Sequence, residues 1–240
     1  MSRETFLARV REATQAGRAY RIEPHGEVTA TTGYVGGGMD LCATFAAEAN
    51  AVGGFATIVR SWDEARTALG QLLRERNLSS ALVWQHEVLS RLRVSDLLAE
   101  HSIAKLDYES LEQMPRDTRR TMILAADVGI TSADYAIAET GTLAMFAQPG
   151  HERLASLAPP LHIAVIERQQ ILPDLFDLFA VLGEQGLNAA TEPNTSDTRL
   201  PSNVTLITGP SKTGDIELQL TTGVHGPGEW RIIVIDELAT

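Results

Sequence analysis

Short apolar runs alternate with stretches of helical spacing through most of the chain. A helical stretch from Phe45 leads through two glycines into the apolar run 55–59. Further apolar runs follow at 80–84, 102–106, 161–167, 203–208 and 230–236, and helical patterns lie at 63–76, 88–99, 109–125 and 173–186. Strands that alternate with helices predict an α/β fold, in which a mostly parallel sheet is covered by helices.

Length and composition fit one globular domain with a sizeable core, because 44% of the 240 residues are hydrophobic and 21% are charged. The formal net charge of −11 argues against general nucleic-acid binding, which needs a basic face to neutralise phosphates. Residues 1–22 differ, since they hold five arginines and two glutamates. This basic stretch predicts a helix that either forms ion pairs with the acidic remainder of the chain or binds an acidic partner or a membrane.

The sequence lacks the patterns that mark several common kinds of site and segment. The single cysteine, Cys42, excludes an internal disulfide and a four-thiolate iron–sulfur cluster held by this chain alone. The histidines form no HxH or HExxH pair, and the glycine run 36–38 lacks the third glycine of a dinucleotide fingerprint. No run approaches the roughly 18 to 20 apolar residues of a membrane span, and the start lacks the apolar core of a secretory signal. We therefore expect a cytoplasmic protein with no cofactor of its own.

Residues 127–146 combine carboxylates, hydroxyls and small residues in one mostly apolar run, with Glu139 at its centre. One interpretation is helical. In it Thr131 is the N-cap, Asp134 completes a capping box three residues later, and Gly141 ends the helix.

The other interpretation, which we favour, is a pair of strands. Residues 135–139 form the first strand, Thr140 and Gly141 make a turn, and 142–146 return as the second strand. Glu139 then lies at the end of a buried element, which is where pockets of α/β proteins open. The alternative for Glu139 is that it accepts hydrogen bonds from the turn amides.

A second polar loop follows the β-branched run that ends before Gly209. Loops with successive free amides bind anions, and here Lys212 would add a positive charge while Ser211 and Thr213 supply neutral donors. The loop is not a Walker A motif, because GxxxxGK[ST] is absent. The alternative is an ordinary turn in which Asp215 caps its own backbone.

A histidine between glycines is the third candidate. His225 stands beside Gly226 and a proline, so it either reaches into a cleft as acid, base or donor, or it lies in an exposed turn. We predict that Glu139, Lys212 and His225 meet in one cleft, because all three follow strand-like runs expected to end on one sheet edge. The polar, proline-interrupted stretch 188–202 is predicted to be a mobile loop or lid.

Three motifs, GITSADYAIAETGT, TLITGPSKTGDIE and GVHGPGEW, occur in this order. With this spacing the chain resembles the lactate utilization protein C family, whose chain is a LUD (lactate utilization) domain, from about Phe45 to Val234. The resemblance implies residues 1–44 as an amino-terminal helix and glycine-rich segment, and 45–240 as the LUD domain. It also implies a Rossmann-like three-layer sandwich similar to ribose-phosphate isomerase, glucosamine-phosphate deaminase and the CoA transferases.

The resemblance further implies a role in oxidising L-lactate to pyruvate with an iron–sulfur partner and a cysteine-rich partner, this chain being the subunit without a cluster. The ligand expected in this chain is a small carboxylate or phosphate. Analogy with CoA transferases, which use a glutamate nucleophile, favours Glu139 as a catalytic residue beside His225. Candidate binding residues from the motifs and loops are Thr131, Asp134, Thr140, Gly141, Gly209, Ser211, Lys212, Thr213, Asp215 and Gly226.

Two other functions are compatible with these residues. One is a stand-alone enzyme for a sugar phosphate or acyl-CoA, with Glu139 as base or nucleophile and Lys212 holding the anion. The other is a non-catalytic assembly or regulatory protein. No triad, metal set or cofactor fingerprint in the sequence selects among them.

Overall fold

The computed structural model describes residues 2–18, 36–184, 201–214 and 220–237. The chain divides into two units, Met1–Val35 and Gly36–Thr240. In the first unit the described element is helix α1, Arg3–Arg18, where the sequence predicts a basic helix. All other elements belong to the second unit.

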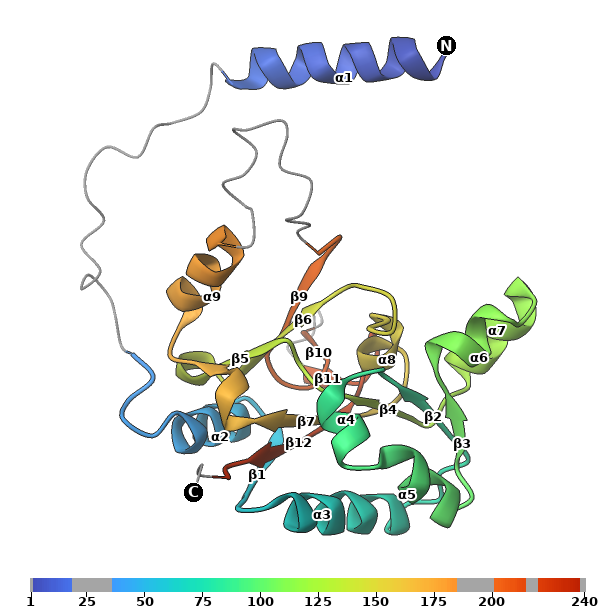
Figure 1. The fold of residues 1–240 in the computed structure, drawn as a ribbon, viewed down its shortest axis with the longest axis vertical. Coiled ribbons are helices and arrows are strands. Elements are labelled where there is room, and N and C mark those ends of the chain that lie inside the picture. Colours follow the sequence, from blue (N-terminus) through green and yellow to red (C-terminus); the bar gives the residue numbers. More distant parts are fainter. Residues whose placement is uncertain (1, 19–35, 185–200, 215–219, 238–240) are drawn as a thin grey trace. The chain divides into compact units, whose positions relative to one another are not determined.

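A parallel sheet of six strands forms the centre of the second unit (Figure 1). Every neighbouring pair of its strands is parallel, so the predicted α/β architecture is confirmed. The strands are short and rich in β-branched residues, and several are buried on both faces, as expected for a covered parallel sheet. In sheet order they are β1 (Phe55–Val59), β12 (Glu229–Ile235), β7 (Leu161–Glu167), β4 (Val128–Thr131), β2 (Ser80–Val83) and β3 (Ala104–Leu106).

Helices connect these strands in two directions across the sheet. From β1 the chain moves through α3 to β2 and on to β3, whereas from β3 it returns to β4, β7 and β12. Because parallel crossovers are right-handed, the outward and return connections lie on opposite faces. The outward helices are α3 (Trp62–Arg74), α4 (Glu87–Arg91) and α5 (Val94–Glu100), and the return path includes α6 (Tyr108–Glu112), α7 (Arg116–Leu124) and α8 (Leu154–Leu157).

Helix α3 shows how sequence sets one of these elements. The Ser61 side chain accepts a hydrogen bond from the Glu64 amide and so caps the helix. Ala65, Leu69 and Leu73, spaced four residues apart, are buried against the sheet. The helix begins one residue before the predicted start and ends two residues before the predicted end, and its apolar stripe fixes which face meets the core.

A second sheet has the strand order β8 (Ile171–Leu172), β5 (Tyr135–Ile137), β6 (Thr142–Phe146) and β9 (Val204–Ile207). Strands β5 and β6 pair antiparallel, which confirms the two-strand interpretation of this stretch. The helical interpretation is wrong, because Gly141 adopts a left-handed φ of 60° that reverses the chain. Glu139 lies between the strands in a 3-10 turn, η1 (Ala138–Thr140).

The remaining elements surround the two sheets. Helix α2 (Leu41–Ala51) packs on β1 and on η1, and α9 (Leu175–Leu182) packs on β5 and β8. A further 3-10 turn, η2 (Arg168–Gln170), precedes β8. Strands β10 (Lys212–Gly214) and β11 (Leu220–Thr222) form a two-stranded antiparallel hairpin before β12.

Two expected helices are each divided, and the strands β4, β8 and β10 were missed. The helix predicted over 88–99 breaks at Arg93, which adopts the left-handed conformation, and the helix predicted over 109–125 breaks before Pro115. Strand β4 is a short run whose Gly129 interrupts the pattern. Glycine is needed there because a Cβ would lie 1.6 Å from the carbonyl oxygen of Ala155. The predicted loop 188–202 lies mostly outside the described residues.

Candidate functional site

The parallel sheet has a topological switch point between β2 and β4. The chain leaves β2 toward β3 and leaves β4 in the opposite direction toward β7, so the two connections diverge at neighbouring carboxyl ends. In open α/β sheets this divergence opens a crevice that binds ligands. Residues 84–87 follow β2 here and residues 132–134 follow β4.

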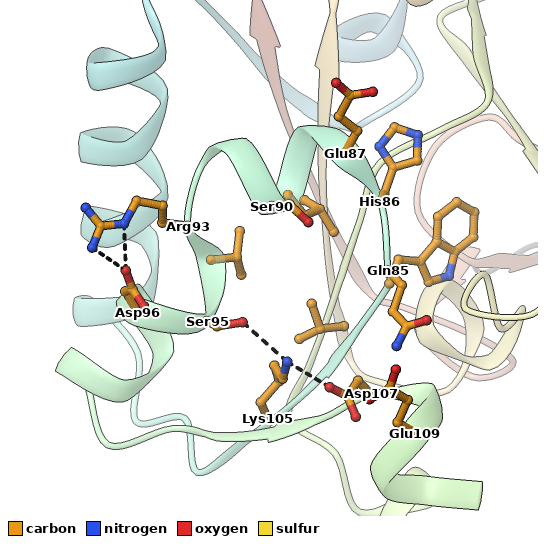
Figure 2. A pocket seen from close by; sticks show the side chains of 14 residues that line it. Gln85, His86, Glu87, Ser90, Arg93, Ser95, Asp96, Lys105, Asp107 and Glu109 are labelled. Carbon is orange, nitrogen blue, oxygen red and sulfur yellow. Dashed lines mark hydrogen bonds and ion pairs between the residues drawn. The ribbon is translucent and has the colours of Figure 1, made fainter.

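A cavity of about 620 Å³ opens at the carboxyl ends of β2 and β3 (Figure 2). We call it the His86 cavity. Across it, the Lys105 ammonium lies 2.7 Å from Asp107 and 3.3 Å from the Ser95 hydroxyl. Burial opposes ionisation of Asp107, yet hydrogen bonds from Lys105 and Ser110 outweigh burial, so the pKa of Asp107 lies below its ordinary value.

The His86 cavity carries more acidic than basic groups. Its second cation, Arg93, is held by Asp96 at 2.7 Å. Glu87 and Glu109 also line the cavity, and neither makes an ion pair with any described residue. Both cations are thus neutralised and two carboxylates remain, so this cavity does not favour an anion.

An aromatic stack separates this cavity from a second one. The His151 ring stacks on Trp84, with centroids 4.3 Å apart and planes 7° apart. The His86 ring lies 5.4 Å from His151, and burial together with this neighbour lowers the pKa of His86. His151 is only 7% exposed.

Hydrogen bonds fix the tautomer of neutral His151. Its Nε2 lies 3.2 Å from the carbonyl oxygen of Gln85, which only accepts, so Nε2 carries the proton. Its Nδ1 then accepts from the Gln148 amide nitrogen at 2.9 Å, and Asp134 Oδ1 lies 3.7 Å from the same atom. Asp134 also accepts from the Phe146 amide at 2.6 Å, which holds the carboxylate beside the ring. A proton arriving at Nδ1 would therefore face a fixed carboxylate.

The second cavity, of about 880 Å³, lies on the other side of His151. We call it the Arg153 cavity. Leu154 and Leu157 supply apolar wall, and Gln148 supplies an amide. Arg153 also lines this cavity, and its guanidinium, with five donors, makes no hydrogen bond or ion pair with the described residues.

A buried carboxylate occupies the other half of the same sheet edge. Asp236, just after β12, is 2% exposed and accepts hydrogen bonds from Arg60 and Arg168. The Arg168 hydrogen bond is the main reason that the pKa of Asp236 lies below its ordinary value. Cys42 Sγ lies 3.6 Å away, and burial, reinforced by Asp236, raises the pKa of the Cys42 thiol to about 12. This cluster ties the start of α2 to the carboxyl edge, and its thiol is unreactive.

Parts of the first two sequence motifs meet elsewhere, around the carboxyl end of α2. A Cβ on Gly141 would lie 2.2 Å from the Ala49 amide nitrogen, and Lys212 Nζ donates to the Val52 carbonyl oxygen at 2.5 Å. Hydroxyl groups link the two loops, since Thr142 contacts both Thr140 and Thr208 at 2.7 Å. The lysine therefore satisfies a helix terminus, where a cation also complements the helix dipole.

Glu139 and Lys212 follow strands that end on one edge of the second sheet, because the carboxyl ends of β5 and β9 both pair with the amino end of β6. The predicted shared edge is wrong for His225, which precedes β12 of the parallel sheet and lies near its amino end. There the Gly228 amide donates to the Pro160 carbonyl oxygen, just before β7. The meeting of all three side chains in one cleft stays a prediction.

The other predicted site residues have varied surroundings. Gly209 needs its φ of 89° and packs on the Val52 carbonyl, while Gly226 packs on the Ser211 side chain. Thr213 pairs with Thr221 in the hairpin, and His225 is exposed. Asp215 lies outside the described residues.

Thr131 and Glu139 differ from their predicted settings. Thr131 is fully buried and its hydroxyl lies 2.8 Å from His162 Nε2, so it faces the core and no opening. Burial lowers the pKa of His162 to about 3. The half-buried Glu139 carboxylate has no hydrogen bond or ion pair with described residues, and the Gly141 amide bonds to Ala138 instead. The turn-amide alternative for Glu139 is therefore wrong.

Of the crevice residues, the sequence prediction included Asp134, which lies 3.7 Å from His151, and missed the others. The signal was available for Gln85 and His86, because polar residues directly follow the apolar run 80–84. Arg153 and His151 carry no such signal. They lie in the loop after β6, and only the fold brings that loop onto Trp84.

The part of the chain that the structure describes contains neither a candidate metal site nor a candidate membrane-spanning helix. No three or more histidine, cysteine or acidic side chains gather there in a way that would hold a metal ion. Within the same residues, no helix has both the length and the apolar character needed to cross a membrane.

Comparisons with known proteins place the chain in a family. The model of the LUD domain matches residues 42–235. Lactate utilization protein C of Halalkalibacterium halodurans is 31% identical over 175 residues, which are 73% of this chain and 70% of that protein. The protein of the same name from Shouchella clausii is 31% identical over 173 residues, which are 71% and 69% of the two chains.

A solved structure supports the fold alone. The crystal structure of a DUF162 family protein from Deinococcus radiodurans matches with a TM-score of 0.51 and 19% sequence identity, and covers 81% of this chain and 96% of that one. The expected likeness to isomerase, deaminase and CoA transferase folds stays a prediction. The family match and the curated relatives together show that this chain belongs to the LUD domain family.

Proposed function

We propose that this protein takes part in lactate utilization, as the cluster-free subunit of a system that oxidises L-lactate to pyruvate with iron–sulfur and cysteine-rich partners. Two similar proteins are named lactate utilization protein C, which supports the process. We further propose that the chain itself binds the small carboxylate, in the Arg153 cavity.

The observation that carries this assignment is the state of Arg153. Its guanidinium lines the cavity and makes no ion pair with any described residue. An arginine fork matches the two oxygens of a carboxylate, and the apolar surface of Leu154 and Leu157 suits the methyl group of lactate. His151 also lines this cavity, and its Nδ1, beside Asp134, is a group suited to taking up the hydroxyl proton.

The proposal includes partner proteins because the oxidation of lactate needs an electron acceptor. Oxidation of lactate to pyruvate releases two electrons and two protons, and amino-acid side chains offer acids and bases but no electron sink. The chain has one cysteine, so it does not ligate a four-thiolate cluster by itself. The proposal therefore places electron transfer on the iron–sulfur partner and leaves binding and orientation to this chain.

The test is lactate-dependent reduction of a dye by the purified chain, by the purified partners and by the mixture. The proposal predicts activity in the mixture alone. Turnover by this chain alone, or full activity of the partners without it, contradicts the proposal. An Arg153→Gln mixture separates a binding subunit from a pure assembly factor, because an assembly factor would support full activity despite the substitution.

A second candidate function rests on Glu139. Its half-buried carboxylate has no described partner, which suits a base or nucleophile acting on an acyl-CoA or sugar phosphate. Incubation of the chain with acetyl-CoA and a carboxylate acceptor, followed by mass spectrometry of Glu139, tests it. The Glu139 carboxylate would displace CoA to form a mixed anhydride, and the released CoA would then displace acetate to leave a CoA thioester on Glu139. A CoA thioester on Glu139 that is absent from Glu139→Gln would favour this function over the first.

A further inference from the structure

Helix α7 carries three arginines within five residues, at positions 116, 119 and 120. At 3.6 residues per turn they span roughly 100° of arc on one side of the helix. Arg116 and Arg120 are exposed and Arg119 is half-buried, and no residue of α7 is fully buried. With Asp117 as its sole acidic residue, the helix carries a formal charge of +2 on a chain of −11.

These arginines differ from most others in the second unit. Seven of the twelve described there make ion pairs, namely Arg60, Arg66, Arg76, Arg91, Arg93, Arg168 and Arg231. Arg74 donates to a backbone carbonyl. The guanidinium groups of the α7 arginines have no hydrogen bond or ion pair with the described residues, a state they share with Arg153 alone.

Two nearby acids make no ion pair with these arginines. Glu109 and Glu112 lie on the preceding helix α6, where Glu112 accepts a hydrogen bond from the Tyr108 hydroxyl and Glu109 lines the His86 cavity. On α7 itself, Met122 and Ile123 pack against the core and hold the helix in place. Leu124 at its end is 63% exposed, which adds an apolar contact beside the cations.

We infer that α7 is the docking surface for an acidic, electron-carrying partner protein. Electron-transfer encounters bury little area and depend on charge steering, so a small exposed cationic helix fits them better than it fits a permanent interface. An anionic membrane is the alternative occupant, and the association test below distinguishes it from the partner protein. The inference rests on the proposed function for the identity of the partner, the iron–sulfur protein of the lactate system.

The test measures association of the full chain with the immobilised, purified iron–sulfur partner at about 50 mM and about 500 mM NaCl. The variant is Arg116→Gln/Arg119→Gln/Arg120→Gln, in which glutamine keeps the helix propensity. The control is Arg3→Gln/Arg9→Gln/Arg11→Gln on α1, the other basic helix, which removes the same charge from exposed residues and so compares the two candidate surfaces. Circular dichroism verifies the fold of both.

We expect the α7 variant to associate about tenfold more slowly at low salt and the control to stay within about twofold of wild type. High salt should remove the difference. Unchanged association of the α7 variant, equal loss in the α1 control, or no binding by wild type overturns the inference. If the α7 variant instead loses binding to anionic phosphatidylglycerol vesicles, the helix docks on a membrane, and this result would also overturn the inference.

Dye reduction separates this inference from the proposed function. If wild type binds the partner through α7 but adds nothing to lactate-dependent reduction, the docking surface stands and the proposed function fails. If reduction requires the chain and the α7 variant supports it fully at both salt concentrations, the function stands and the docking surface fails.

Discussion

The two ends of the parallel sheet carry different kinds of residue. Near the amino end, motif residues such as Gly141, Gly209 and Lys212 contact the backbone of α2. At the carboxyl end, the Asp236 cluster and the crevice beside Trp84 hold carboxylates, guanidiniums and imidazoles in contact with one another. The first region consists of close backbone packing and the second of ionisable side chains.

The difference teaches that a dense motif does not by itself mark a binding site. Glycines and hydroxyls between strands serve as well to let a helix end approach a turn, and here they meet at α2. The ionisable side chains are dispersed along the chain at strand ends, and the topology assembles them.

Gly141→Ala should have the largest effect, because it tests the packing role of the amino-end region. The new Cβ would lie 2.2 Å from the Ala49 amide nitrogen, on a residue whose φ is 60°. We expect the free energy of unfolding to fall by roughly 4 kcal/mol or more. Urea unfolding measures it, with Gly214→Ala as control, since no atom lies within 4 Å of that Cβ. Equal stability of the two variants would contradict close packing at Gly141.

Asp236→Asn tests the ionic cluster at the carboxyl end. Arg60 and Arg168 would lose their shared carboxylate, so we expect a loss of roughly 3 kcal/mol in the free energy of unfolding at pH 7. Asp117→Asn, on the surface of α7, is the control and should change it little.

The sign of the pH dependence follows from the lowered pKa of Asp236. Its stabilisation is present above the unfolded carboxyl pKa of about 3.9 and is lost as pH falls through the lower folded pKa. Wild type should therefore lose part of its advantage over Asp236→Asn below about pH 4. A constant difference from pH 7 to pH 2 would argue against an ionised Asp236.

His162 gives a separate dependence at higher pH. Burial lowers its pKa to about 3, so the unfolded chain takes up a proton there that the folded chain does not. Stability is then lost as pH falls below the unfolded pKa of about 6.5, by about 2 kcal/mol at pH 5. His162→Gln should reduce the slope between pH 7 and pH 4 in denaturant unfolding. An unchanged slope would show that His162 is protonated in the fold.

The sequence carries enough information for the parallel sheet, because an apolar run such as 161–167 is typical of a strand buried on both faces. It also favours the turn at Gly141 correctly. It does not reveal β4, whose pattern Gly129 interrupts for a contact with Ala155 that only the fold creates.

The site residues were harder to predict for a related reason. Lys212 has the composition of an anion-binding loop, and a contact with Val52, 160 positions away in sequence, decides its role. Arg153 lies in an unremarkable loop and gains its setting from Trp84 and His151. Side chains positioned by distant contacts leave no local spacing to detect.

Calorimetric titration of L-lactate tests the central claim that the ligand binds beside the carboxyl-end crevice and not at the motif loops. Because Arg153 is exposed, we expect Arg153→Gln to weaken binding about fivefold, which corresponds to about 1 kcal/mol of binding free energy. Lys212→Gln, which removes a cation from the other region, should leave the affinity within about twofold of wild type. Loss of binding in Lys212→Gln with normal binding in Arg153→Gln would contradict the account and return the ligand site to the motif loops.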